Sequence, residues 1–157
     1  TTMYLPVRLL LFLVSNIAAT LAVPITARGL PSIAEIKTLS ASAAFSVASS
    51  NGYAVTCATY AGSPEMADAI NAAQALLQEQ QCVKPAHSGS TYTLLSLQSA
   101  SLGLVGSETW SLPCAAAAEL FALVAVACQA DVDGVVRAGG QLKYAAPDHS
   151  LGLAYET

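Results

Sequence analysis

The chain has 157 residues and a formal net charge of −4; 10% of its residues are charged and 54% are hydrophobic. This length supports a single domain. The six Lys and Arg residues are scattered and form no basic stripe, so nucleic acid is disfavoured as a partner.

Residues 1–22 are predicted to be a signal peptide, with Met3 as the start, that sends the protein to the extracellular space. A positive charge precedes an unbroken apolar run, and small residues precede the cleavage point; these are Arg8, Leu9–Val14, Thr20 and Ala22. The run is shorter than the ~20 apolar residues that a membrane span needs. Secretion is therefore favoured over an uncleaved membrane anchor.

Residues 23–50 are expected to be a linker or pro-segment. They contain Pro24, Gly29 and Pro31, and the Ser- and Ala-rich stretch Ser40–Ser50 has the bias of low-complexity sequence. The folded domain is expected over residues 51–157.

The first half of this domain is predicted to hold a strand, a helix and a hairpin. Residues 53–59 alternate as a strand does. Ser63, as the N-cap, and Pro64 then open a helix that ends at Cys82. After a loop over residues 83–90, two strands are expected at Thr91–Leu97 and Ala100–Val105, joined by a turn at residues 98–99.

The second half is predicted to begin with an almost wholly apolar helix over residues 114–128, which Pro113 precedes. A polar turn follows at residues 131–134, and final strands are expected at Gln141–Ala146 and Leu151–Glu156, turned at residues 147–149. The order β-α-β-β-α-β with an extra strand predicts an α+β, ferredoxin-like split β-α-β sandwich. This fold has one antiparallel sheet with both helices on one face.

The four cysteines are expected to form two disulfides, because an even number of Cys in a short exported chain indicates bridges. They lack the spacing of a zinc site, and no metal is expected. In the predicted topology Cys57 and Cys128 lie at one end of the sandwich, and Cys82 and Cys114 lie at the other. The expected pairs are therefore Cys57–Cys128 and Cys82–Cys114.

The ordered motifs resemble a group of small secreted proteins of filamentous fungi. The matching residues are Tyr53, Val55 and Cys57, Ser63-Pro64, Cys82, His87-Ser88-Gly89, Pro113-Cys114 with Ala115–Ala118, Cys128 and Gly139-Gly140. These proteins are similar to virally encoded fungal killer toxins with an α/β-sandwich fold, and several are described as candidate plant-infection effectors. The group often has two further cysteines, where this chain has Ser90-Thr91 and Val105-Gly106. The resemblance implies a non-enzymatic effector or toxin-like protein.

No arrangement of residues typical of a catalytic, cofactor or metal site is found. Ser63 lacks a nucleophile-elbow motif, and His87 and His149 are expected to be solvated loop residues. Asp131, Asp133 and Gly134 resemble the start of a calcium loop without its remaining ligands. Gly139-Gly140 lacks the residues of a phosphate loop. Glu108, beside Trp110, is expected to pack in a loop.

The apolar helix over residues 114–128 needs a cover, because a helix that is apolar all round is normally buried all round. Residues 30–48 could pack over its outer side, or its alanines could simply be exposed, because alanine is tolerated at a protein surface. A homodimer seam or a membrane-contact face is the alternative.

Three function classes follow from the sequence. The first is a secreted non-enzymatic protein that binds an extracellular or host protein or surface component. The second is a small secreted hydrolase or carbohydrate-binding domain. The third is a cell-surface structural protein held by an uncleaved amino-terminal apolar segment.

Overall fold

The computed structural model describes residues 29–144 and 149–155. The predicted signal peptide, and most of the turn predicted at residues 147–149, lie outside the described residues. The helices are α1 (Ile33–Ile36), α2 (Ala41–Ser50), α3 (Met66–Leu76) and α4 (Cys114–Ala127). The strands are β1 (Ala54–Cys57), β2 (Gln81–Lys84), β3 (Thr91–Leu97), β4 (Ala100–Val105), β5 (Trp110–Pro113), β6 (Gln129–Val132), β7 (Val135–Ala138), β8 (Gly140–Lys143) and β9 (Ser150–Tyr155).

Five strands form an antiparallel sheet in the order β1-β8-β9-β4-β3. The α+β class is therefore confirmed, but the ferredoxin-like strand order is not reproduced. A split β-α-β sandwich places its first strand inside the sheet. Here β1 lies at the edge, and the extra carboxy-terminal strand β9 lies between β8 and β4.

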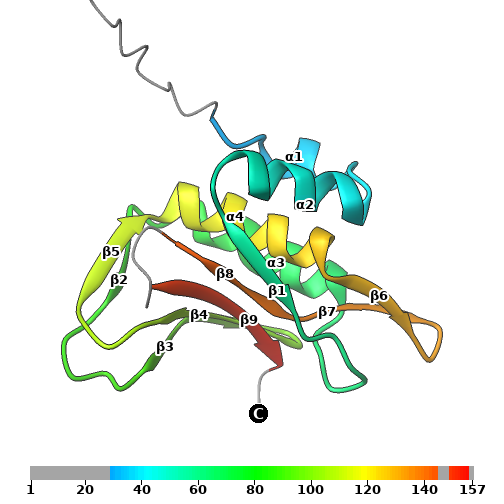
Figure 1. Ribbon diagram of the computed structural model, residues 1–157. Coiled ribbons are helices and arrows are strands. Elements are labelled where there is room, and N and C mark those ends of the chain that lie inside the picture. Colours follow the sequence, from blue (N-terminus) through cyan, green and yellow to red (C-terminus); the bar gives the residue numbers. More distant parts are fainter. Residues whose placement is uncertain (1–28, 145–148, 156–157) are drawn as a thin grey trace, which may run out of the picture.

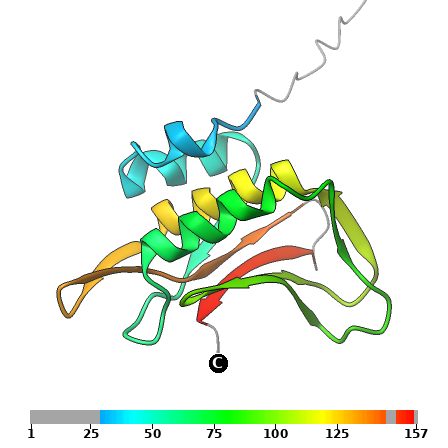
Figure 2. The same cartoon turned by 180° about the vertical axis from the view of Figure 1, so that it is seen from behind.

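Strand alternation sets the two faces of this sheet. The leucines of β4, β8 and β9 pack inward and are buried: Leu102, Leu104, Leu142, Leu151 and Leu153. Helices α3 and α4 cover this face (Figure 1). The opposite face carries small and polar residues, among them Gly103, Gln141 and Gly152, and no helix within residues 29–144 and 149–155 covers it (Figure 2). One face of the sheet thus holds the core.

Helix α4 is the centre of the molecule. Residues 120–128 are all buried. The sheet and α3 contact the helix on its inner sides, and α1 and α2 lie on its outer side (Figures 1 and 2). The amino-terminal helices α1 and α2 therefore cover the outer side of α4. A seam or membrane contact through residues 114–128 would first require α1 and α2 to move away.

The segment 23–50 differs from the expected linker over its second half. Ser32 and Glu35 form a capping box at the start of α1, and Ser40 caps α2. Ile33, Ile36, Ala44 and Ala48 are buried in the same core as α4. The packed structure therefore begins about twenty residues before the expected boundary at residue 51.

The predicted start and end of the first helix are corrected by the structure. Ser63 does not cap α3: its hydroxyl accepts from the Tyr60 N–H and donates to the Ala58 carbonyl, and α3 begins at Met66. The helix ends at Leu76, and Cys82 lies on β2, in a segment predicted to be helix end and loop. β2 pairs with β5 as a separate ribbon, and β6 with β7 as another.

Both disulfides join the expected residues. Cys57 is bonded to Cys128 across 71 residues and Cys82 to Cys114 across 32. The β2–β5 ladder, in which Gln81 is opposite Pro113, brings the second pair together. The expected reason, that Cys82 closes the first helix, is wrong because α3 ends at Leu76. Each bridge removes freedom from the unfolded chain, worth roughly 3–5 kcal/mol in the loop-entropy account.

Helix α4 carries one charged residue, the half-buried Glu119. Burial raises the pKa of its carboxyl above the ordinary 4.5. The folded state therefore holds this proton more tightly than the unfolded chain does, and an unfavourable contribution appears as the pH rises through and above 4.5.

We therefore expect Glu119→Gln to raise the Tm at neutral pH and to lose this benefit in acid. Thermal unfolding of both proteins between about pH 3 and about pH 7 measures the difference. An equal gain at every pH would assign the effect to packing instead of ionisation.

Candidate functional site

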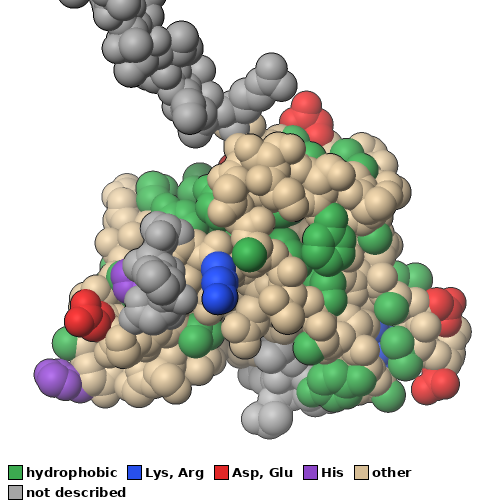
Figure 3. All heavy atoms as spheres, in the orientation of Figure 1, with side chains coloured by type: hydrophobic (Ala, Val, Ile, Leu, Met, Phe, Trp, Pro, Cys, Tyr) green, Lys and Arg blue, Asp and Glu red, His purple; other side chains and the backbone are tan. Residues whose placement is uncertain are grey.

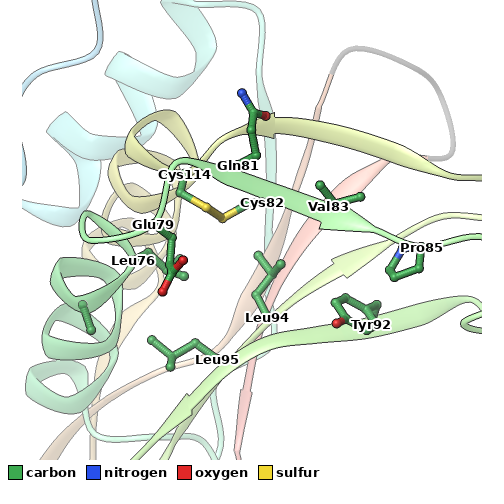
Figure 4. A pocket seen from close by; sticks show the side chains of 11 residues that line it. Leu76, Glu79, Gln81, Cys82, Val83, Pro85, Tyr92, Leu94, Leu95 and Cys114 are labelled. Atoms are coloured by element: carbon green, nitrogen blue, oxygen red, sulfur yellow. A yellow bond between two sulfur atoms is a disulfide. The ribbon is translucent and has the colours of Figure 1, made fainter.

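A groove lies between β2, β3 and the carboxyl end of α3, and we call it the β2–β3 groove. Its volume is about 370 Å³. It is lined by Ala75, Leu76, Glu79, Gln81, Cys82, Val83, Pro85, Tyr92, Leu94, Leu95 and Cys114. Figure 4 shows Leu94 and Leu95 from one wall, Val83 from the other, and the Cys82–Cys114 disulfide at the end next to α3.

A β-bulge makes the β3 wall of this groove unusually apolar. Strict alternation would send neighbouring residues to opposite faces. The pairing of β3 with β4 shifts between Thr93 and Leu95, which leaves Leu94 as the extra residue. Leu94 and Leu95 are in consequence both half-buried and both line the groove.

Two exposed apolar side chains, Val83 and Tyr92, line the groove. They are among seven large hydrophobic side chains that are exposed in the described part of the chain. Exposed apolar side chains at the rim of a hollow are typical of an interaction site.

Charged residues make up 10% of the chain, and one of them lines the groove. On the face shown in Figure 3 the acidic side chains lie towards the margins of the view. Within the groove Glu79 is the one charged residue of the lining. Its carboxylate makes no hydrogen bond or ion pair with the residues that the structure describes. It also follows closely on the carboxyl end of α3, where the helix dipole disfavours negative charge.

The residues singled out from sequence are not brought together into one site. Exposed His87 lies in the loop after β2, and the His149 ring stacks on Trp110 at 4.7 Å between centroids. Asp131 accepts from the Gly134 N–H and supports the tight turn between β6 and β7. Glu108 is exposed before β5.

Gly139 and Gly140, which do not form a phosphate loop, are explained by close packing of the backbone around them. A Cβ at residue 140 would lie 2.6 Å from the Thr56 carbonyl oxygen and 2.9 Å from Cys128 Sγ. At residue 139 it would lie 2.7 Å from Ser63 Oγ. Glycine is therefore required at both positions: at residue 140 because β8 passes close to β1 and to the Cys57–Cys128 bridge, and at residue 139 because the loop after β1 passes close by.

Sequence reasoning missed a buried lysine. Lys84 is only 1% exposed, and its ammonium donates one hydrogen bond, 3.2 Å long, to Ser88 Oγ. Its cross-strand neighbour Trp110 has a buried Nε1 without a hydrogen-bond partner among the described residues. Alternation along β2 (exposed, buried, exposed, buried) buries Lys84, but the four residues QCVK are too few to show this pattern in the sequence.

Among the described residues this buried ammonium has one neutral partner, and such an arrangement lowers stability, since desolvation of a charge is compensated only by good pairing. Lys84→Met, which keeps the length of the side chain, is expected to raise the free energy of unfolding by about 1 kcal/mol or more. Denaturant unfolding measures this change. A clear loss of stability would show that the ammonium has a strong partner.

A second hollow, of about 300 Å³, lies on the uncovered face of the sheet. Gly152 and Gly140 contribute to its lining, together with Thr91 and Gln141. Tyr60, which is 62% exposed, borders it from the loop before α3. The hollow combines an aromatic ring with uncharged hydrogen-bonding side chains.

No group of three or more His, Cys, Asp or Glu side chains that could hold a metal ion occurs among the described residues. None of the helices within residues 29–144 and 149–155 has the length and hydropathy needed to cross a membrane.

The fold and this groove define a class: a small α+β protein with two disulfides and an apolar surface groove beside a free sheet edge. Beyond that class, comparison with protein-family models, with curated proteins and with solved structures finds no match.

Proposed function

We propose that the chain is a secreted, non-enzymatic protein of the effector or killer-toxin-like kind, and that it binds an extracellular or host target through the β2–β3 groove. The observation that carries this proposal is a hollow of about 370 Å³ that is lined by the exposed side chains of Val83 and Tyr92 and by the half-buried Leu94 and Leu95. Two disulfides are compatible with an oxidising, extracellular setting.

A matched pair of variants tests the role of the groove. Tyr92 in the groove is 36% exposed and Phe45 on α2 is 37% exposed, so an Asp at either position removes a similar aromatic surface. The labelled protein is applied to plant leaf cells and to competitor-fungus cells, and bound label is measured. We expect Tyr92→Asp to weaken binding roughly tenfold or more, as loss of an aromatic anchor does.

Phe45→Asp is expected to bind like the unchanged protein, and matching thermal unfolding of both variants excludes misfolding as the cause. Equal binding by the two variants would remove the groove from the proposal. Absence of binding to either cell type would remove the support for an effector or toxin-like role at those surfaces.

The second candidate is a small secreted hydrolase or carbohydrate-binding domain. The hollow on the uncovered sheet face favours its carbohydrate-binding form, because the ring of Tyr60 can stack on a sugar while Thr91 and Gln141 supply hydrogen bonds. Binding to a glycan array that is lost in Tyr60→Ala and kept in Tyr92→Asp would favour this candidate over the groove.

A further inference from the structure

We infer that the occupant of the β2–β3 groove is an extended segment of a partner polypeptide, which adds to the free edge of β3 and places a Lys or Arg against Glu79. This inference rests on the proposed function of the groove and names the chemistry of its partner.

The edge strand β3 is open to pairing. It is the last strand in the order β1-β8-β9-β4-β3, so its backbone pairs on one side only within the described residues. Its seven residues, TYTLLSL, include no charged residue and no proline. Edge strands are usually protected by charges, by proline or by being short. The opposite edge strand, β1, has only four residues.

A second strand edge faces the same space. β2 pairs with β5 on one side, and its other side borders the groove (Figure 4). β2 and β3 are consecutive strands that separate towards α3, and the groove fills the space between them. Backbone N–H and C=O groups need hydrogen-bond partners, and an inserted strand would supply them to β3 directly.

The groove walls set the side chains of such a strand. Alternate residues of an extended segment point the same way, at about 6.6 Å intervals given a rise of ~3.3 Å per residue. Leu94 and Leu95 from β3, with Leu76 from α3, present an apolar surface to those residues. The partner segment should therefore be apolar at every second position.

Glu79 sets the charge of the segment. It is the charged residue of the groove lining and lacks an ion-pair partner among the described residues, and it lies beside the negative end of the α3 dipole. A Lys or Arg of the partner would form a charge-assisted hydrogen bond there. A partner with an acidic residue at this point would be rejected.

The probe is a displayed library of random linear nonapeptides, selected on the full chain immobilised at a terminus. We expect an enriched family with apolar residues at alternate positions and one Lys or Arg. A synthetic peptide of the consensus should bind Glu79→Lys roughly tenfold more weakly or worse, because a favourable charge pair becomes a repulsive one. Glu65→Lys, a charge reversal at the other end of α3, is the matched control and should bind like the unchanged protein.

Three outcomes would overturn the inference: no enriched family, a consensus that ignores Glu79→Lys, or a dimer of the free protein in sedimentation that dissociates in Thr93→Pro. The last would identify a second copy of this chain as the occupant of the β3 edge. If Tyr92→Asp weakens binding to cells but the library yields no enriched peptide family, the proposed function stands and only strand addition is ruled out.

Discussion

Replacing Cys82 and Cys114 together with Ala is expected to lower the free energy of unfolding by about 3–4 kcal/mol, the loop-entropy value for a closed loop of this size. The bridge closes 32 residues that include all of β3, β4 and β5 and all of β2 except Gln81. Without it β2 is held by its short ladder with β5 and by the backbone bond from the Cys114 N–H to the Gln80 carbonyl. Denaturant unfolding gives the change in free energy.

Hydrogen exchange locates the same effect. Amides of β2 should exchange faster in this double variant, because Cys82 no longer anchors this groove wall to the first residue of α4. The exchange rates of the α4 amides should change only as much as global stability changes. The control is the double variant that lacks the Cys57–Cys128 bridge, which closes 71 residues. In this control the exchange rates of the β2 amides should change only as much as global stability changes. A loss below about 1 kcal/mol with unchanged exchange in β2 would contradict the assigned role.

Gly140→Ala is expected to destabilise the protein by about 1–3 kcal/mol, the usual range for overpacking a tight site. The new Cβ would lie 2.6 Å from the Thr56 carbonyl oxygen, 2.9 Å from Cys128 Sγ and 3.2 Å from Cys57 Cα. Two of these atoms belong to backbone and the third to a disulfide, so none can move cheaply. The free energy of unfolding in denaturant measures the loss.

Gly152→Ala is the matched control, since it lies on β9 next to β8 in the same sheet. A Cβ there would meet Val105 Cγ2 at 3.6 Å, an ordinary contact. We expect the change to be neutral or slightly stabilising, because Ala restricts the unfolded chain. Equal losses at residues 140 and 152 would show that close approach of β8 to β1 is not the reason for glycine.

The hairpin of β3 and β4 was predictable from sequence with its residue bounds. Residues 91–97 and 100–105 lie on either side of Gln98-Ser99, and Gln98 takes a left-handed φ of 55°. No glycine marks this turn, so the flanking strand patterns carried the prediction. The four-residue strands β2, β5, β6 and β7 were missed because each is too short to show a period.

The amino-terminal helices were hidden by composition. Ser and Ala dominate residues 40–50, which made the segment resemble low-complexity sequence, although Ser32 followed by Glu35 was a readable capping box. Their burial depends on α4, which begins at Cys114, 64 residues after the end of α2 at Ser50. Tertiary packing supplies most helical stability. Local sequence could not show that partner.

The disulfide pairing agreed with expectation although the strand order did not. Cys57 ends β1 and Cys128 follows α4, and both lie beside Gly140, so their pairing needs only that β8 runs next to β1. The position of β9 is a non-local choice that no residue pattern encodes. The groove depends on such choices too: the free edge of β3 exists because β9 pairs with β4 on its other side.

The most direct test of the groove as the binding site is site-specific photo-cross-linking on target cells. A benzophenone amino acid is placed at Tyr92 in one protein and at Phe45 in another, two positions of nearly equal exposure. If the target binds in the groove, we expect a discrete protein adduct from residue 92 that excess unlabelled protein displaces, and no adduct from residue 45. Equal adducts from both positions, or an adduct from residue 45 alone, would contradict binding in the groove.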